Sequence, residues 1–325
     1  MPAVLLIAGG VALLVAIVAV LAVYGAEQLT RPKRCDLEDT AERWGLPEPH
    51  HLDLRAMDGV RLSAWWFHHA EASASVIVAH GHGGNKESSL WVAAELFPRF
   101  NVLLLDLRGH GQSGGERTSV GFLERLDILA AVRWLDAQSG ERPVGVLGIS
   151  MGGAAAILAA GSEERPRIAA VVADSPFARL RSPVLAAICG RGYPRAVSPV
   201  LAWSVCTIAS WQVRARRALD PIDVVERIAP RPLLIIHGEA DALTPVENAY
   251  ALYQRAGQPK ELWVAPGVEH ARVAASDPRA YADRIRAFFE RSLLLLESGS
   301  QPAAAARAGH RHDIRECQLQ EVDRG

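Results

Sequence analysis

The chain of 325 residues carries a serine in a setting typical of a catalytic nucleophile. Ser150 stands in the pattern G-x-S-x-G at 148–152, which follows an apolar run and precedes an alanine-rich stretch. This order predicts a sharp strand-to-helix turn, with glycines needed where side chains would crowd it. The helix that begins there offers backbone N–H groups and a positive dipole end to a developing oxyanion. Because a serine hydroxyl is a weak nucleophile at neutral pH, the chemistry also requires a base and an acid that orients it.

Asp241 is the predicted acid. It lies in a loop just past the apolar run 232–236. On this architecture the acid follows the serine and precedes the histidine in chain order. Asp174, at the end of the run 168–173, is the rival, because some proteins of this architecture carry the acid at that strand end.

His270 is the predicted base. It follows the last apolar run, 261–265, and the other histidines after Asp241 are His310 and His312 in the C-terminal tail. We interpret those two as part of a solvated tail and not as a metal site. The serine, acid and base thus fall at three strand ends in the order that acyl transfer requires.

The loop after the run 75–79 reads HGHGGN and is expected to complete an oxyanion hole. Glycines let the backbone approach a substrate carbonyl closely. We assign the hole to the N–H groups of His82 and Met151. His80 is expected to fix the loop by hydrogen bonding. A zinc site at His80 and His82 is disfavoured, since no further ligand is suitably placed.

Composition argues against several other classes of protein. Lys and Arg number 35 against 36 Asp and Glu, so the net charge is -1 and there is no basic bias for nucleic acid. The four cysteines form no C-x-x-C pair, which argues against a disulfide framework or a cysteine zinc site. The glycine-rich segment 106–115 lacks the spacing of phosphate-binding loops and is predicted to be a structural turn. We expect neither a metal nor an organic cofactor.

Short apolar runs alternate with helical patterns through most of the chain. Several runs are unbroken, which suits strands covered on both faces. The alternation predicts right-handed crossovers, a mainly parallel sheet and therefore an α/β fold, with one doubly wound domain at 49–296. The predicted strands are 60–67, 75–79, 101–105, 143–149, 168–173, 232–236 and 261–265.

The N-terminus carries no charged residue from Pro2 to Ala26. A helix of that length spans about 37 Å, more than the roughly 30 Å of bilayer hydrocarbon. A cleaved signal peptide, the alternative, has a basic start and a shorter apolar stretch. We predict a transmembrane anchor at 1–26, a juxtamembrane linker at 27–48 and a disordered tail at 297–325.

Basic residues follow the predicted span, while only the α-amine precedes it. The positive-inside rule then predicts that the large domain stays in the cytoplasm. The basic residues are Arg31, Lys33, Arg34 and Arg43.

The segment 178–219 interrupts the sheet pattern and is predicted to form a small helical cap over the site. In one interpretation its apolar face simply packs on the core. In the other, Trp203, Trp211 and their neighbours line an acyl pocket for a membrane-derived substrate.

Five motifs together resemble the α/β-hydrolase superfamily, and within it the serine-aminopeptidase-like and monoglyceride-lipase-like hydrolases, over about residues 50–295. The resemblance implies an α/β-hydrolase fold with Ser150 as nucleophile, Asp241 as acid and His270 as base. Branches that use Asp as nucleophile, the dehalogenases and epoxide hydrolases, are disfavoured. The motifs are HGHGGN at 80–85, DLRGHGQSGG at 106–115, GISMGG at 148–153, HGEADALTP at 237–245 and GVEH at 267–270.

We therefore expect a membrane-anchored serine hydrolase that cleaves carboxylic esters through an acyl-enzyme, with lipid-derived acyl esters as candidate substrates. An aminopeptidase or amidase with the same residues is one alternative. A peptidase of that kind would need an anionic group for the substrate's α-amine, and the cap at 178–219 contains no Asp or Glu. A non-catalytic, membrane-anchored binding scaffold is the other alternative.

Overall fold

The computed structural model describes residues 2–34, 39–139, 142–163, 167–215 and 218–294. The predicted tail at 297–325, with its two histidines, lies outside these ranges.

An eight-stranded sheet forms the centre of the described chain, in the order β1-β2-β4-β3-β5-β6-β7-β8. β2 pairs antiparallel with both β1 and β4, and every other neighbouring pair is parallel. The strands are β1 His50–Arg55, β2 Arg61–Phe67, β3 Ser75–Ala79, β4 Asn101–Leu105, β5 Val144–Ile149, β6 Ile168–Asp174, β7 Leu233–Gly238 and β8 Lys260–Ala265.

The predicted α/β fold with a mostly parallel sheet is confirmed, and each predicted run lies on a strand. The additional strand is β1, which was not predicted. It lies at the edge of the sheet and contributes only alternate leucines, Leu52 and Leu54, to the interior. Such a half-exposed strand lacks the continuous apolar run that marks the buried strands.

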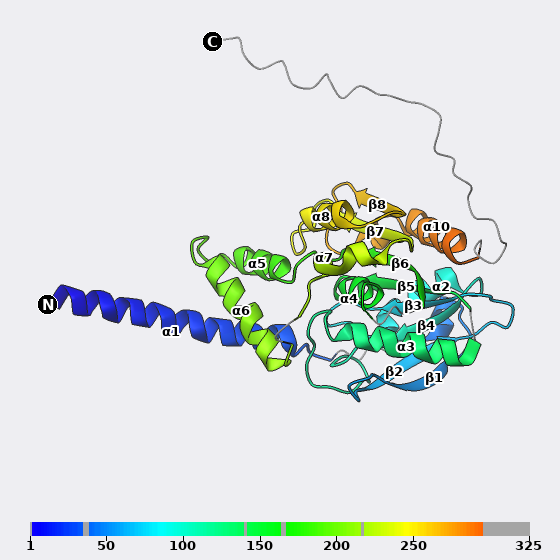
Figure 1. Ribbon diagram of the computed structural model, residues 1–325, viewed down its shortest axis with the longest axis horizontal. Coiled ribbons are helices and arrows are strands. Elements are labelled where there is room, and N and C mark those ends of the chain that lie inside the picture. Colours follow the sequence, from blue (N-terminus) through cyan, green and yellow to red (C-terminus); the bar gives the residue numbers. More distant parts are fainter. Residues whose placement is uncertain (1, 35–38, 140–141, 164–166, 216–217, 295–325) are drawn as a thin grey trace, which may run out of the picture.

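Helices cover both faces of the sheet (Figure 1). Neighbouring residues of β5 show the division, because Val146 belongs to the core cluster that contains α3, α4 and α8 residues, while Leu147 belongs to the cluster that contains α2 and α10 residues. The helices of these two layers are α2 Leu90–Leu96, α3 Glu124–Ser139, α4 Met151–Ala160, α8 Glu247–Arg255 and α10 Pro278–Phe289. Shorter helical turns complete the domain at η1 Ala41–Trp44, η2 Lys86–Ser89, α7 Pro221–Val224, η3 Val225–Ile228, α9 Val273–Ser276 and η4 Glu290–Leu294.

Two helices, α5 (Arg181–Gly190) and α6 (Ser198–Gln212), form a cap between β6 and β7. The N-terminal helix α1 (Pro2–Thr30) projects from the body, and its last turns pack against α6 (Figure 1). Residues spaced by four along α1 are buried there: Ala22, Ala26 and Thr30. This spacing places them on one face of the helix. The last turns of helix α1 therefore pack against the cap, in addition to any part that α1 has in a membrane span.

By length and composition, α1 can cross a membrane. The candidate span is Ala3–Thr30, with a mean hydropathy of 3.1 in its best window. A signal sequence near the N-terminus passes the same test.

The segment predicted as a linker, 27–48, contacts the domain through residues of its described parts, 27–34 and 39–48. It begins inside α1, and Thr30 accepts a backbone hydrogen bond from Thr118 at 2.8 Å. The Arg34 guanidinium donates to the carbonyl oxygens of Ser113 and Gly115, both at 2.7 Å. These contacts are made with residues 113–118, in and just after the glycine-rich loop 106–115. Because those residues are remote in sequence, the composition of the segment did not reveal the contacts.

That glycine-rich loop wraps around a buried carboxylate. Asp106 accepts hydrogen bonds from the backbone and Nζ of Lys86, at 2.6 and 2.7 Å, and from the backbone of Gln112 at 2.8 Å. Both side chains of the Lys86–Asp106 ion pair are almost fully buried. A Cβ at Gly111 would overlap the Asp106 carboxylate. The loop is thus organised by one desolvated ion pair.

Replacing Lys86 with methionine should lower the free energy of unfolding by about 3–5 kcal/mol, because Asp106 is left buried without its counter-charge. Urea denaturation in detergent, followed by tryptophan fluorescence, measures the loss. Arg99→Met is the matched control, since its pair with Glu290 is largely exposed and is worth about 0–1 kcal/mol. Equal losses in the two variants would contradict a structural role for the buried pair.

Candidate active site

Ser150 occupies a strained turn between β5 and α4. Its backbone has φ 54° and ψ −113°, a conformation that non-glycine residues rarely adopt. A Cβ at Gly148 would overlap the carbonyl of Gly152, and a Cβ at Gly152 would overlap the carbonyl of Ala79. The Ser150 N–H donates to the Asp174 carbonyl at 2.7 Å. Flanking glycines and this hydrogen bond thus allow helix and sheet to approach closely enough to form the turn.

A continuous hydrogen-bonded chain runs from Ser150 through His270 to Asp241. Ser150 Oγ lies 2.9 Å from His270 Nε2, and His270 Nδ1 lies 2.6 Å from Asp241 Oδ2. The structure therefore brings together the three residues singled out from the sequence. In this arrangement His270 can take a proton from the serine, while Asp241 orients the imidazole and favours its charged form.

The loop after β7 holds Asp241 as a carboxylate. Oδ1 accepts the backbone N–H groups of Leu243 and Thr244, at 3.0 and 2.7 Å. Although burial acts to raise its pKa, hydrogen bonds from His237, His270 and the Thr244 N–H lower the pKa of Asp241 to about 2. Asp241 is therefore ionised throughout the neutral range.

His237 is a residue of the site to which the sequence analysis assigned no role. It is buried at the end of β7, and its Nε2 donates to the Thr244 carbonyl at 2.7 Å while lying 3.3 Å from Asp241 Oδ2. It thus holds both ends of the turn that carries the acid. The available signal was its position four residues before Asp241, at the end of an apolar run.

Asp174, the rival acid, has other partners. Its carboxylate accepts hydrogen bonds from the hydroxyls of Ser175 and Tyr281, both at 2.9 Å. Burial raises the pKa of Asp174 and also that of Tyr281. In the described part of the chain, His270 Nδ1 donates its hydrogen bond to Asp241, while the carboxylate of Asp174 accepts from Ser175 and Tyr281.

The two residues assigned to the oxyanion hole lie beside Ser150. Met151 begins α4, where the first N–H groups of a helix have no intrahelical acceptor, and it lines the same pocket as His82. His80 stabilises the loop 80–85 by two hydrogen bonds. Its Nδ1 donates to the Gly81 carbonyl at 2.7 Å, and its Nε2 accepts from the Leu107 N–H at 3.1 Å. Burial, followed by the nearby His110, lowers the pKa of His80 to about 4. His80 is thus a neutral, structural histidine at pH 7.

A pocket of 410 Å³ opens above Ser150. This volume is within the range typical of small-molecule sites. Its walls are mainly apolar and come from three places: the end of α1, the cap helices and the loops around the serine. Asp and Glu are absent from its described lining, and Arg191 is the one Lys or Arg there.

The hypothesis that Trp203 and Trp211 line this pocket is wrong. Both are on α6 but are 59% and 61% exposed, and the lining residues of that helix are Leu201 and Val205. Residues four apart share a helix face, whereas Trp203, midway between the two, lies on another side. The packing of α6 against α1 decides which face is covered.

Known proteins resemble this chain in sequence and in fold. The family model described as serine aminopeptidase, S33, matches residues 70–229. Protein YqkD of Bacillus subtilis is 31% identical over 223 residues, which cover 66% of this chain and 71% of that protein. YfhR of Escherichia coli K12 is 30% identical over 236 residues, covering 69% of this chain and 75% of that protein. The solved structure of the Pyrococcus furiosus esterase Pf2001 is 28% identical with a TM-score of 0.67, covering 81% of this chain and all of that one.

The lowered pKa of Asp241 predicts how its contribution to stability depends on pH. The carboxylate has an ordinary pKa of 3.8 and a folded pKa of about 2, so its stabilisation is complete above about pH 4 and is lost as the pH falls toward 2. Urea denaturation of wild type and Asp241→Asn over this range should show a difference in unfolding free energy that shrinks only below about pH 4. A difference that has already vanished at about pH 5 would contradict the hydrogen-bonded carboxylate.

Proposed function

Because the chain belongs to the serine aminopeptidase S33 family of the α/β-hydrolase superfamily, we propose that it hydrolyses carboxylic esters through an acyl-enzyme on Ser150. The observation that carries this proposal is the hydrogen-bonded chain Ser150–His270–Asp241, whose serine lines a mainly apolar pocket.

In the proposed reaction, His270 Nε2 takes the proton of Ser150 as Oγ attacks the ester carbonyl carbon. The N–H groups of His82 and Met151 stabilise the oxyanion, and Asp241 stabilises the imidazolium. The tetrahedral intermediate then collapses, and the leaving alkoxide receives the proton from His270. Water, deprotonated by the same imidazole, attacks the acyl-enzyme and releases the carboxylic acid and the serine.

The lining of the pocket favours esters with an apolar acyl group over peptides with a free N-terminus. An α-ammonium group needs an anionic partner, and the described lining offers neither Asp nor Glu. The Pyrococcus furiosus protein, 28% identical, is named an esterase, which supports the same choice. An aminopeptidase and a non-catalytic scaffold remain the rivals to be tested.

A fluorophosphonate probe should label the wild-type protein in detergent and should not label Ser150→Ala, because the probe requires an activated serine. Ester hydrolysis should fall by about 10⁴-fold or more in Ser150→Ala and by about 10⁴-fold in Asp241→Asn. Asp174→Asn is the matched control and should retain most of the activity.

Absence of labelling in folded wild-type protein would favour the binding scaffold. A larger loss in Asp174→Asn than in Asp241→Asn would instead reassign the acid. Hydrolysis of aminoacyl amides in preference to esters would favour the aminopeptidase.

We also propose that α1 is retained as a membrane anchor, with the hydrolase domain in the cytoplasm. The support is that four Lys and Arg residues follow the span at 31–43, whereas none precedes it. A reporter enzyme that is active only in the periplasm, fused to the C-terminus, should be inactive, and the matching cytoplasmic reporter should be active. The reverse result would place the domain on the other side.

A further inference from the structure

The last turns of α1 form one wall of the pocket above Ser150. Five residues of the helix line it: Leu21, Tyr24, Gly25, Gln28 and Leu29. The facing wall comes from the cap, with Val184 and Ile188 on α5 and Leu201 and Val205 on α6. A helix that served only as a tether would need no contact with the site.

Direct contacts fix this part of α1 to the hydrolase domain and to the cap. His82 Nε2 donates to the Leu29 carbonyl at 2.9 Å, which joins the helix to the loop of the proposed oxyanion hole. Glu27 pairs with Arg117 at 2.7 Å. A Cβ at Gly25 would lie only 2.9 Å from Val205, so helix α1 and the cap are in close contact there. These contacts therefore fix the position of the α1 wall relative to Ser150.

The pocket extends along α1 away from the site. Leu29 is tied to the loop beside Ser150, and Leu21 lies eight residues earlier on the same helix. At 1.5 Å per residue these two residues are separated by about 12 Å along the axis. The walls between them are mainly apolar. This length and polarity suit an acyl chain of medium length.

If α1 spans the bilayer as proposed, its length places the outer end of the pocket at the boundary of the hydrocarbon. Residues 3–17 are all exposed, which gives a freely projecting length of about 23 Å, short of the roughly 30 Å of hydrocarbon. The span must therefore include the next turns, from Val18 to Ala22, which are the ones that begin to pack on the cap. Tyr24 follows, 64% exposed, at the depth where aromatic side chains favour the membrane interface. Leu21 thus lies where the hydrocarbon ends.

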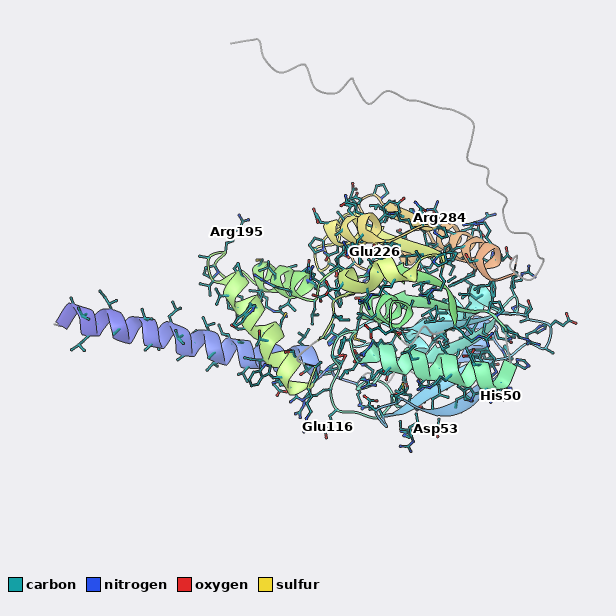
Figure 2. The ribbon with its side chains drawn as sticks, viewed as in Figure 1. His50, Asp53, Glu116, Arg195, Glu226 and Arg284 are labelled. Atoms are coloured by element: carbon teal, nitrogen blue, oxygen red, sulfur yellow. The ribbon has the colours of Figure 1, made fainter. Side chains whose placement is uncertain are left out.

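The basic residues at and just after the end of α5 agree with this position at the membrane boundary. Figure 2 shows Arg195 on the side of the body from which α1 projects, and both Arg195 and Arg191 are exposed. The cap segment 178–219 contains no Asp or Glu. Basic side chains at this level are attracted to anionic lipid headgroups.

We propose that residues 21–29 of α1 are a specificity-determining wall of an acyl-binding groove that begins at the membrane boundary and leads a bilayer ester's acyl chain to Ser150. The inference rests on the proposed ester hydrolysis. It names the substrate class as esters of medium or longer acyl chains that partition into the bilayer. It also assigns to α1 a part in substrate selection.

Two variants that fill the groove from opposite walls test the proposal. Leu21→Trp acts from α1 and Ala187→Phe acts from α5, and both residues line the pocket. The measured quantity is kcat/KM for p-nitrophenyl decanoate divided by kcat/KM for p-nitrophenyl acetate, with the full chain in detergent. Wild type should prefer decanoate, and each variant should lower the decanoate-to-acetate ratio by about 10-fold or more, since one buried methylene is worth about 0.8 kcal/mol.

Val20→Trp is the matched control. Val20 neighbours Leu21 on the same helix but is 68% exposed and does not line the pocket. Its decanoate-to-acetate ratio should equal that of wild type. Intact mass of the purified protein must show that α1 is present, because a chain cleaved before residue 27 would overturn the proposal.

The outcomes separate this inference from the proposed function. Suppose that wild type hydrolyses the acetate ester and is labelled by fluorophosphonate. If it shows no preference for decanoate, or if Leu21→Trp and the control Val20→Trp have the same decanoate-to-acetate ratio, α1 is only an anchor and the proposal falls. Ester hydrolysis then still stands. If folded wild type neither labels nor hydrolyses any ester, the proposed function fails, and the inference fails with it.

Discussion

The close approach of helix α4 to the sheet at Ser150 is the constraint from which the rest of the site follows. The serine adopts a positive φ because β5 ends directly beneath the start of α4, and Gly148 and Gly152 leave no side chain between them. Such a backbone costs of order 1–3 kcal/mol. Burial of every residue of α4 offsets that cost, since the helix cannot withdraw from the sheet without exposing its apolar side chains. The same turn places both Ser150 and Met151 in the lining of one pocket.

Parallel strands then bring the remaining groups to the same edge of the sheet. His270 is 120 residues from Ser150 in sequence and 29 from Asp241, yet each pair is in hydrogen-bonding contact. Strands β7 and β8 pair in parallel, so the loops that follow them lie side by side. The loop after β7 is stabilised by the negative charge of Asp241, because this carboxylate accepts hydrogen bonds from two N–H groups of its own turn. Conformation and ionisation of this carboxylate are thus coupled.

The pocket above these groups depends on a different set of contacts. The cap helices supply one wall, but the other belongs to α1. This helix approaches the cap closely at Gly25 and contacts the loop after β3 through the His82–Leu29 hydrogen bond. An apolar N-terminal helix therefore has two environments along its length. Its first turns project from the body, and its last turns are part of the domain (Figure 1). This division places the site near the membrane surface if α1 spans the bilayer.

The sequence by itself determined the features that depend on local order. Unbroken apolar runs predicted seven strands, and the positions of Ser150, Asp241 and His270 after three of them predicted which side chains would meet, because parallel strands end at one edge. Edge strand β1 was not predicted, since a half-exposed strand has no continuous apolar run. Only the tertiary structure assigned His237 to the acid's turn and Asp174 to Tyr281. It alone also turned Leu201 inward and Trp203 outward on α6. Both tryptophan and leucine are apolar, so the pattern along α6 could not decide which face is covered; the contact with α1, nearly two hundred residues earlier in the chain, decides it.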